Sequence, residues 1–127
     1  MGYMRHHMIV VTTYDEPLIH KAHDKACEIF QVPNHFGKHS QVTPITVSPV
    51  NEYFTFFVPT DGSKEGWTDS EDGDERRAEF VTWLNAQRFS DNSSPFKWAE
   101  VQYGDERRDN KVLRHDGEIE PCDPDDQ

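Results

Sequence analysis

The chain has 127 residues, enough for one hydrophobic core but not for two, so we expect a single domain. Its formal net charge of −11 repels phosphate backbones and therefore disfavours binding of DNA or RNA through a basic face. The apolar run at residues 8–11 is too short for a signal-peptide core or a membrane span, so we expect a cytoplasmic protein with no membrane partner.

Two segments hold nearly all of the excess acid. Residues 61–79 contain eight acidic and three basic side chains, and residues 105–127 contain nine acidic and four basic ones. Segments of this kind suit a basic protein partner, although keeping the protein soluble is the simpler role for them.

The first half of the chain predicts a strand, a helix, a loop and an edge strand. Residues 4–13 are rich in β-branched side chains, and Asp15 is placed to cap a helix over residues 16–31. Residues 33–41 contain Pro, Asn and Gly and are predicted as a loop. Residues 42–50 alternate like a strand but contain two prolines, which places them at a sheet edge or in a bulge.

The second half predicts two strands around a helix. Residues 53–58 (YFTFFV) give the strongest strand signal, after a turn at residues 51–52. A loop over residues 59–74 leads to a second helix that Asp72 or Asp74 would cap. Residues 96–103 (FKWAEVQY) alternate as a final strand.

This order predicts an α+β fold, a ferredoxin-like βαββαβ two-layer sandwich with an acidic C-terminal extension. The alternative is an α+β fold in which the two proline-bearing segments are not strands. We place the sandwich domain at residues 1–104 and a charged tail at residues 105–127, with a short hairpin around Asp116-Gly117.

One stripe of the first helix offers metal-ligand chemistry. His20, His23 and Cys27 lie at i, i+3 and i+7, and with His35 or His39 they could bind zinc. Structural zinc sites usually take paired ligands from tight turns, so we favour a packing or solvation role and predict no cofactor.

The loop before the second helix offers a possible nucleotide site. Lys64, Trp67, Arg76 and Arg77 combine positive charge, an aromatic stacking face and the amides of a helix start. The nearby acids oppose an anion. Residues 52–58 resemble the third-strand pattern of RNA-recognition domains, but Asn51-Glu52 replaces the Lys/Arg-Gly start, so we do not predict nucleic-acid binding.

A two-layer sandwich leaves one sheet face without helices, and aromatic residues there need cover. We assign Ala99, Val101 and Tyr103 to the core, which leaves Phe96 and Trp98 on the open face. This assignment of residues to the two faces of the strand predicts a homodimer, or a tail folded over the sheet, with Trp98 buried at that contact.

Four segments of the chain carry a resemblance: MRHHMIVVTTYDEP, PTDGSKEGW, DERRAEFVTWLNAQR and WAEVQYGDE. Over roughly Met4 to Gly104, the chain resembles a group of small acidic proteins encoded by bacteriophages and prophages. The resemblance assigns no activity and no functional residues. It implies a context in which small accessory proteins bind and disable a host factor or sequester a host signalling molecule.

We therefore expect a binding protein rather than an enzyme, one that inhibits or sequesters a host defence factor in the host cytoplasm. The contact would use the acidic loop at Asp69, Glu71, Asp72 and Asp74, the start of the second helix and the open sheet face. Two alternatives stay open: a sponge for a small nucleotide signal, and a metal-dependent or histidine-based hydrolase.

Overall fold

The computed structural model describes residues 4–34, 37–40, 42–60, 62, 68–105, 108 and 110–116, and of these it describes 31–34, 37–40 and 68–70 by their backbone alone. The fold is mixed α+β. Its elements in chain order are β1 (Arg5–Thr13), α1 (Glu16–Ile29), β2 (Gln31–Asn34), β3 (Gly37–Ser40), β4 (Thr46–Val47), β5 (Phe54–Val58), α2 (Thr68–Ala86), β6 (Lys97–Gly104) and β7 (Lys111–His115).

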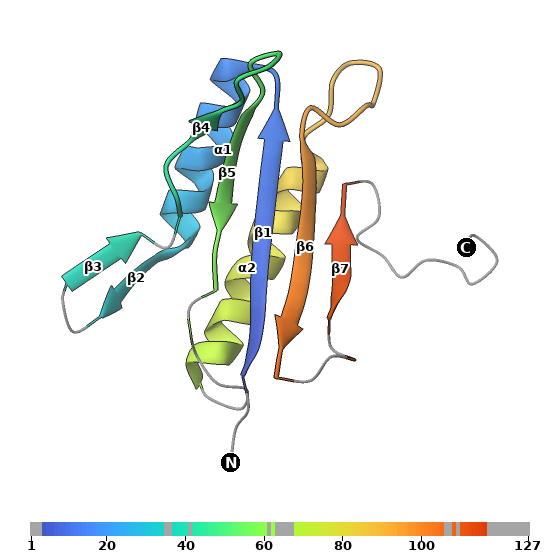
Figure 1. Ribbon diagram of the computed structural model, residues 1–127. Coiled ribbons are helices and arrows are strands. Elements are labelled where there is room, and N and C mark those ends of the chain that lie inside the picture. Colours follow the sequence, from blue (N-terminus) through green and yellow to red (C-terminus); the bar gives the residue numbers. More distant parts are fainter. Residues whose placement is uncertain are drawn as a thin grey trace.

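The main sheet has five strands in the order β4-β5-β1-β6-β7, and every neighbouring pair is antiparallel. Both helices lie on one side of this sheet, and β2 and β3 form a separate hairpin after α1 (Figure 1). The central strand β1 places Val11 between Phe56 of β5 and Trp98 of β6. Within the described part of the chain, neither helix has the length and apolar character needed to cross a membrane.

The predicted α+β class is confirmed, but the number and order of the strands differ from the predicted sandwich. Residues 33–41 were expected to be a loop, yet β2 and β3 pair there, and Pro33 is tolerated because both strands of a two-stranded sheet are edges. Strand β7 pairs with β6, while the second half of the hairpin expected around Asp116-Gly117 lies outside the described residues. The sheet therefore continues beyond the predicted domain boundary at Gly104.

Helix α1 begins where the sequence predicts. The Asp15 carboxylate accepts a hydrogen bond from the Leu18 amide at 3.1 Å, and Pro17 occupies the first turn, where its missing N–H costs nothing. One stripe of the helix is fully buried against the sheet and consists of Ile19, Ala22, Ala26 and Ile29.

Helix α2 begins at Thr68, so Asp72 and Asp74 lie inside it and the predicted caps are wrong. Acidic residues in the first turns interact favourably with the positive end of the helix dipole, which explains an earlier start through an acidic segment. The buried stripe of α2 repeats at helical spacing and consists of Gly73, Arg77, Phe80, Val81 and Leu84. Arg88 lies after the end of the helix and is exposed.

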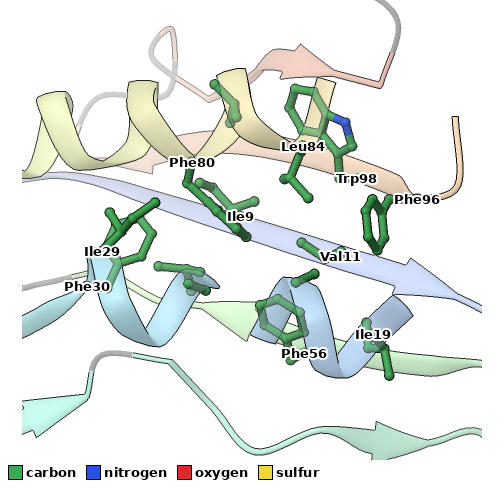
Figure 2. Close-up of a cluster of buried hydrophobic side chains, with 14 residues drawn as sticks. Ile9, Val11, Ile19, Ile29, Phe30, Phe56, Phe80, Leu84, Phe96 and Trp98 are labelled. Atoms are coloured by element: carbon green, nitrogen blue, oxygen red, sulfur yellow. The ribbon is translucent and has the colours of Figure 1, made fainter. Parts of the chain in front are cut away.

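The hydrophobic core fills the layer between the helices and the sheet (Figure 2). Phe80 of α2 lies at its centre, with ring centroids 5.8 Å from Phe30 and 6.4 Å from Phe56. Its ring also stacks on Trp83 at 6.2 Å. The aromatic residues thus compensate for a lean apolar composition, as their large buried area allows.

The prediction that Ala99, Val101 and Tyr103 of β6 face the core is wrong. Trp98 is 3% exposed and packs in the core under α2, so it is not available for a contact with a partner. Ala99, Val101 and Tyr103 face the open side instead, opposite β1 residues of the same face. The indole Nε1 of Trp98 is buried and has no hydrogen-bond partner among the described residues. The same face of β6 also buries the polar residues Glu100 and Gln102.

The proline-bearing segment before β5 lies at the sheet edge, as predicted, but only Thr46–Val47 forms a strand. Asn51 and Glu52 form the turn to β5 with φ values of 64° and 48°. The left-handed backbone reverses the chain within the space between two paired strands.

Candidate functional site

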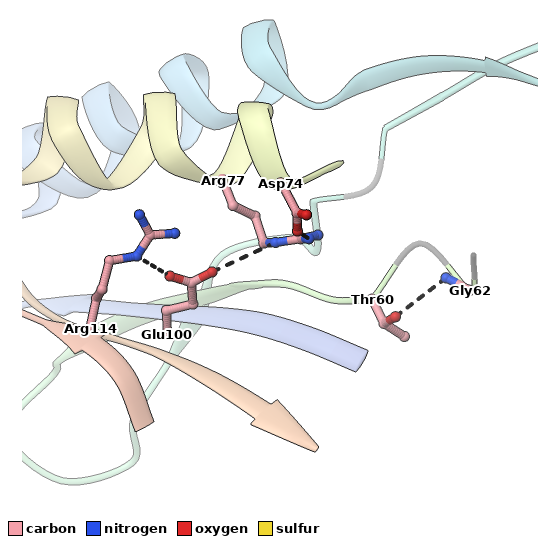
Figure 3. Close-up of polar contacts among 6 residues, drawn as sticks. All are labelled: Thr60, Gly62, Asp74, Arg77, Glu100 and Arg114. Atoms are coloured by element: carbon pink, nitrogen blue, oxygen red, sulfur yellow. Dashed lines mark hydrogen bonds and ion pairs between the residues drawn. The ribbon is translucent and has the colours of Figure 1, made fainter. Parts of the chain in front are cut away.

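A buried charge network connects α2, β6 and β7. Glu100 is 1% exposed, and its carboxylate accepts a hydrogen bond from Arg114 Nε at 2.5 Å. Arg77 Nε lies 3.6 Å from the other carboxylate oxygen, and Arg77 Nη2 donates to Asp74 at 2.5 Å. Figure 3 shows Glu100 between the two arginines. The four side chains form a continuous line of alternating charge from the helix surface to the edge strand.

The neighbouring residue Arg76 also points into the fold. It is partly buried, and its guanidinium donates to the backbone carbonyl of Ile29 at the end of α1. Helix α1 has no basic residue in its last turn, so Arg76 supplies the positive charge that the carboxyl end of a helix favours. Both basic residues of the acidic segment within α2 are therefore engaged in the interior contacts of the protein.

The outer surface of α2 is consequently acidic. Five carboxylates along its first three turns are exposed: Glu71, Asp72, Asp74, Glu75 and Glu79. We call this surface the acidic flank of α2. It concentrates negative charge because the arginines that would offset it in the sequence are turned inward. Asp69, also predicted for partner binding, lies on α2, but its side chain is outside the described set.

The predicted nucleotide residues are not gathered into a described site. Lys64 and Trp67 lie outside the described residues. Arg77 is 4% exposed and pairs with carboxylates, while Arg76 binds a backbone carbonyl. Each guanidinium thus already has a partner in the fold, and nothing in their geometry favours a phosphate ligand.

The predicted metal ligands are only partly brought together. His23 Nδ1 lies 3.7 Å from the Cys27 sulfur, whereas His20 is exposed and contacts Glu16 at 4.0 Å. Among the described residues, no group of three or more His, Cys, Asp or Glu side chains has the arrangement of a metal site. His35 lies outside the described residues, and the side chain of His39 is not described either.

The open face of the sheet is the second candidate surface. Its centre is apolar, and Val10 of β1 is paired with Phe57 on one side and Ala99 on the other. Phe57 and Tyr103 are 37% and 39% exposed. At one end His6 packs against Tyr103 with ring centroids 5.3 Å apart. No helix covers this face in the described fold (Figure 1).

No protein-family model, curated protein or solved structure matches this chain. The sequence pointed to the acids of α2, but it did not reveal the buried network, because Glu100 lies in an alternating strand where a charged residue normally marks the solvent face. Only the pairing of β7 with β6 brings Arg114 opposite Glu100.

Proposed function

We propose that the protein is a non-enzymatic binding protein of the phage accessory type, acting in the host cytoplasm to inhibit or sequester a host defence factor. The acidic flank of α2 provides its main contact with a basic surface of that factor. One observation carries the proposal: Arg76 and Arg77 make contacts within the fold, to a backbone carbonyl and to Glu100. Their positive charge therefore does not offset the exposed carboxylates of the acidic flank at the surface. Complementary charge of this kind steers association and gives specificity.

The open sheet face supplies the second part of the proposal. We assign it to a second copy of the chain, since exposed aromatic and aliphatic side chains on adjacent strands form a patch that monomers seldom leave uncovered. In this arrangement the helices lie on the outside of the dimer, and both acidic flanks stay accessible.

The proposed scaffold is a ferredoxin-like core with additions. Strands β4, β5, β1 and β6 with the two helices would constitute that core, and the β2–β3 hairpin and β7 would be additions to it. The addition of β7 supplies Arg114, one of the two partners of Glu100.

The test is affinity capture of partners from bacterial lysate, with the wild-type protein compared to a variant whose acidic flank is neutralised. The variant contains Glu71→Gln, Asp72→Asn, Glu75→Gln and Glu79→Gln, all at exposed positions. Asp74 is kept, because it binds the buried Arg77 and its loss would perturb the fold. We expect the wild type to retain a basic host protein that the variant loses at least fivefold, with weaker retention as salt is raised.

A matched control removes the same number of charges elsewhere. It contains Glu16→Gln, Asp24→Asn, Glu28→Gln and Glu52→Gln, which are exposed and lie outside α2. This control should recover the partner as the wild type does. Equal recovery by all three proteins, equal loss in both variants, or no specific partner of the wild type would each refute the proposed role of the flank.

A further inference from the structure

A cysteine and a histidine on α1 form a pair that the binding role does not use. His23 and Cys27 are separated by four residues, so they lie on the same face of the helix. The Cys27 sulfur lies 3.7 Å from His23 Nδ1, and both side chains are partly buried. Cys27 is not in a disulfide with any described residue.

The protonation state of the neutral His23 ring follows from its second contact. Nε2 lies 2.9 Å from the backbone carbonyl of Thr43, and a carbonyl oxygen can only accept a hydrogen bond. Nε2 must therefore carry the hydrogen, which leaves the lone pair on Nδ1 directed toward the Cys27 sulfur. The imidazole is thus arranged to accept the thiol proton.

The carbonyl that orients His23 is itself firmly held. Thr43 N donates to the carbonyl of Phe57 at 3.0 Å, and the amide of Phe57 donates back to the Thr43 hydroxyl at 2.8 Å. The His23 ring also packs edge-on against Phe56, with centroids 5.2 Å apart. A nucleophile, a base and a fixed group that orients the base are the three parts that activate cysteine and serine nucleophiles elsewhere.

From this geometry we infer that Cys27 is a thiol-exchange site that reacts with low-molecular-weight disulfides, with His23 as its base. The Cys27 thiol proton passes to His23 Nδ1 as the sulfur attacks one sulfur of the disulfide. A new bond forms between Cys27 and that sulfur, and the original S–S bond breaks. The leaving thiolate then takes the proton from His23, so the products are a mixed disulfide on Cys27 and one free small thiol.

The experiment measures the rate at which 5,5′-dithiobis(2-nitrobenzoate) reacts with Cys27 at neutral pH, in protein whose other cysteine is removed by Cys122→Ser. In His23→Gln the amide N–H can still bind the Thr43 carbonyl, but the side chain cannot take a proton. We expect this variant to react about tenfold more slowly than the parent, because the thiolate is the attacking species. His20→Gln, an exposed change on the same helix, should leave the rate within about twofold.

A second measurement separates base catalysis from a change in access to the sulfur. At about pH 10 a cysteine thiol ionises without help, so the rates of the parent and of His23→Gln should converge. Equal rates at neutral pH would overturn the inference, as would a rate deficit in His23→Gln that persists at high pH. It would also be overturned if folded Cys27 reacted no faster than the same thiol in the denatured chain at neutral pH.

Discussion

The two faces of β6 are the reverse of what the polarity of their residues would indicate. The face under α2 contains Glu100 and Gln102 next to Trp98, and all three are buried. The open face contains Val101 and Tyr103, and Tyr103 is 39% exposed. A carboxylate thus lies inside the protein while an aromatic ring lies outside it.

This difference shows that burial along β6 is decided by partners as well as by polarity. Moving a carboxylate out of water is costly unless opposite charge and hydrogen bonds meet it in the interior. Glu100 meets both conditions through Arg77 on α2 and Arg114 on β7. The network therefore connects three successive elements of the chain, α2, β6 and β7, at the covered face of β6.

The largest effect on stability is expected from removing the buried carboxylate on the covered face of β6. Glu100→Leu introduces an apolar side chain of similar size and leaves Arg77 and Arg114 without their shared carboxylate. Removing one partner of a buried ion pair typically costs about 3–5 kcal/mol, so we expect the free energy of unfolding to fall by about that amount. Urea unfolding followed by circular dichroism measures the change.

A triple variant tests whether the loss comes from unpaired charge. Replacing the network with Arg77→Met, Glu100→Leu and Arg114→Met removes the charges together, and Asp74 then becomes an ordinary exposed acid. We expect this protein to be at least about 2 kcal/mol more stable than Glu100→Leu alone. A triple variant as unstable as the single one would mean that packing around Glu100, and not its charge, determines stability.

The sequence predicted the elements whose signals are local. Asp15 and Pro17 indicated the start of α1, and the residues 53–58 indicated β5, although not which of its two faces packs in the core. Features that depend on contacts between residues distant in the chain were not predicted. The buried Glu100 of β6 is paired with Arg77 and with Arg114, which lie 23 and 14 positions from it in the chain. No periodicity within β6 records those partners.

A similar limit applies to the candidate surfaces. Counting charges identified the acids of α2, but the inward direction of Arg76 and Arg77 depends on contacts with α1 and β6. The stripe of His20, His23 and Cys27 suggested ligands, whereas the useful contact is between two of them and a carbonyl 20 residues from His23. Helical spacing shows which side chains share a face, but not what lies opposite them.

A smaller effect on stability is expected from breaking the open face. The double variant Phe57→Ser and Tyr103→Ser removes two exposed aromatic rings of that face and should lower the free energy of unfolding by about 1 kcal/mol or less. If a second copy covers the face, the same variant should convert a dimer into a monomer. Light scattering over a range of protein concentrations measures this.

The control for this prediction changes exposed apolar residues away from the open face. Tyr14→Ser and Val50→Ser alter side chains that are 63% and 68% exposed, and they should leave the molecular mass unchanged. Wild-type protein that is monomeric at every concentration would contradict the dimer. A dimer that survives the loss of Phe57 and Tyr103 would place its contact elsewhere.

The smallest effect on stability is expected at Asp91, a carboxylate that is exposed, unlike that of Glu100. Hydrogen bonds from the Ser93 side chain and backbone hold the pKa of Asp91 below its ordinary value. The Asp91 carboxylate accepts from Ser93 Oγ at 2.6 Å and from Ser93 N at 3.0 Å in the turn before β6. A depressed pKa in the folded state means that the unfolded chain binds more protons, so this contribution to stability is present above about pH 4 and is lost as the pH falls through the folded value.

Asp91→Asn should therefore be less stable than the wild type near pH 6, and the difference in urea midpoint should shrink toward pH 3. Ser93→Ala should weaken the same pH dependence by removing the larger of the two hydrogen-bond contributions. A difference that is constant with pH, or that grows on acidification, would show that the turn does not depend on the charged form of Asp91.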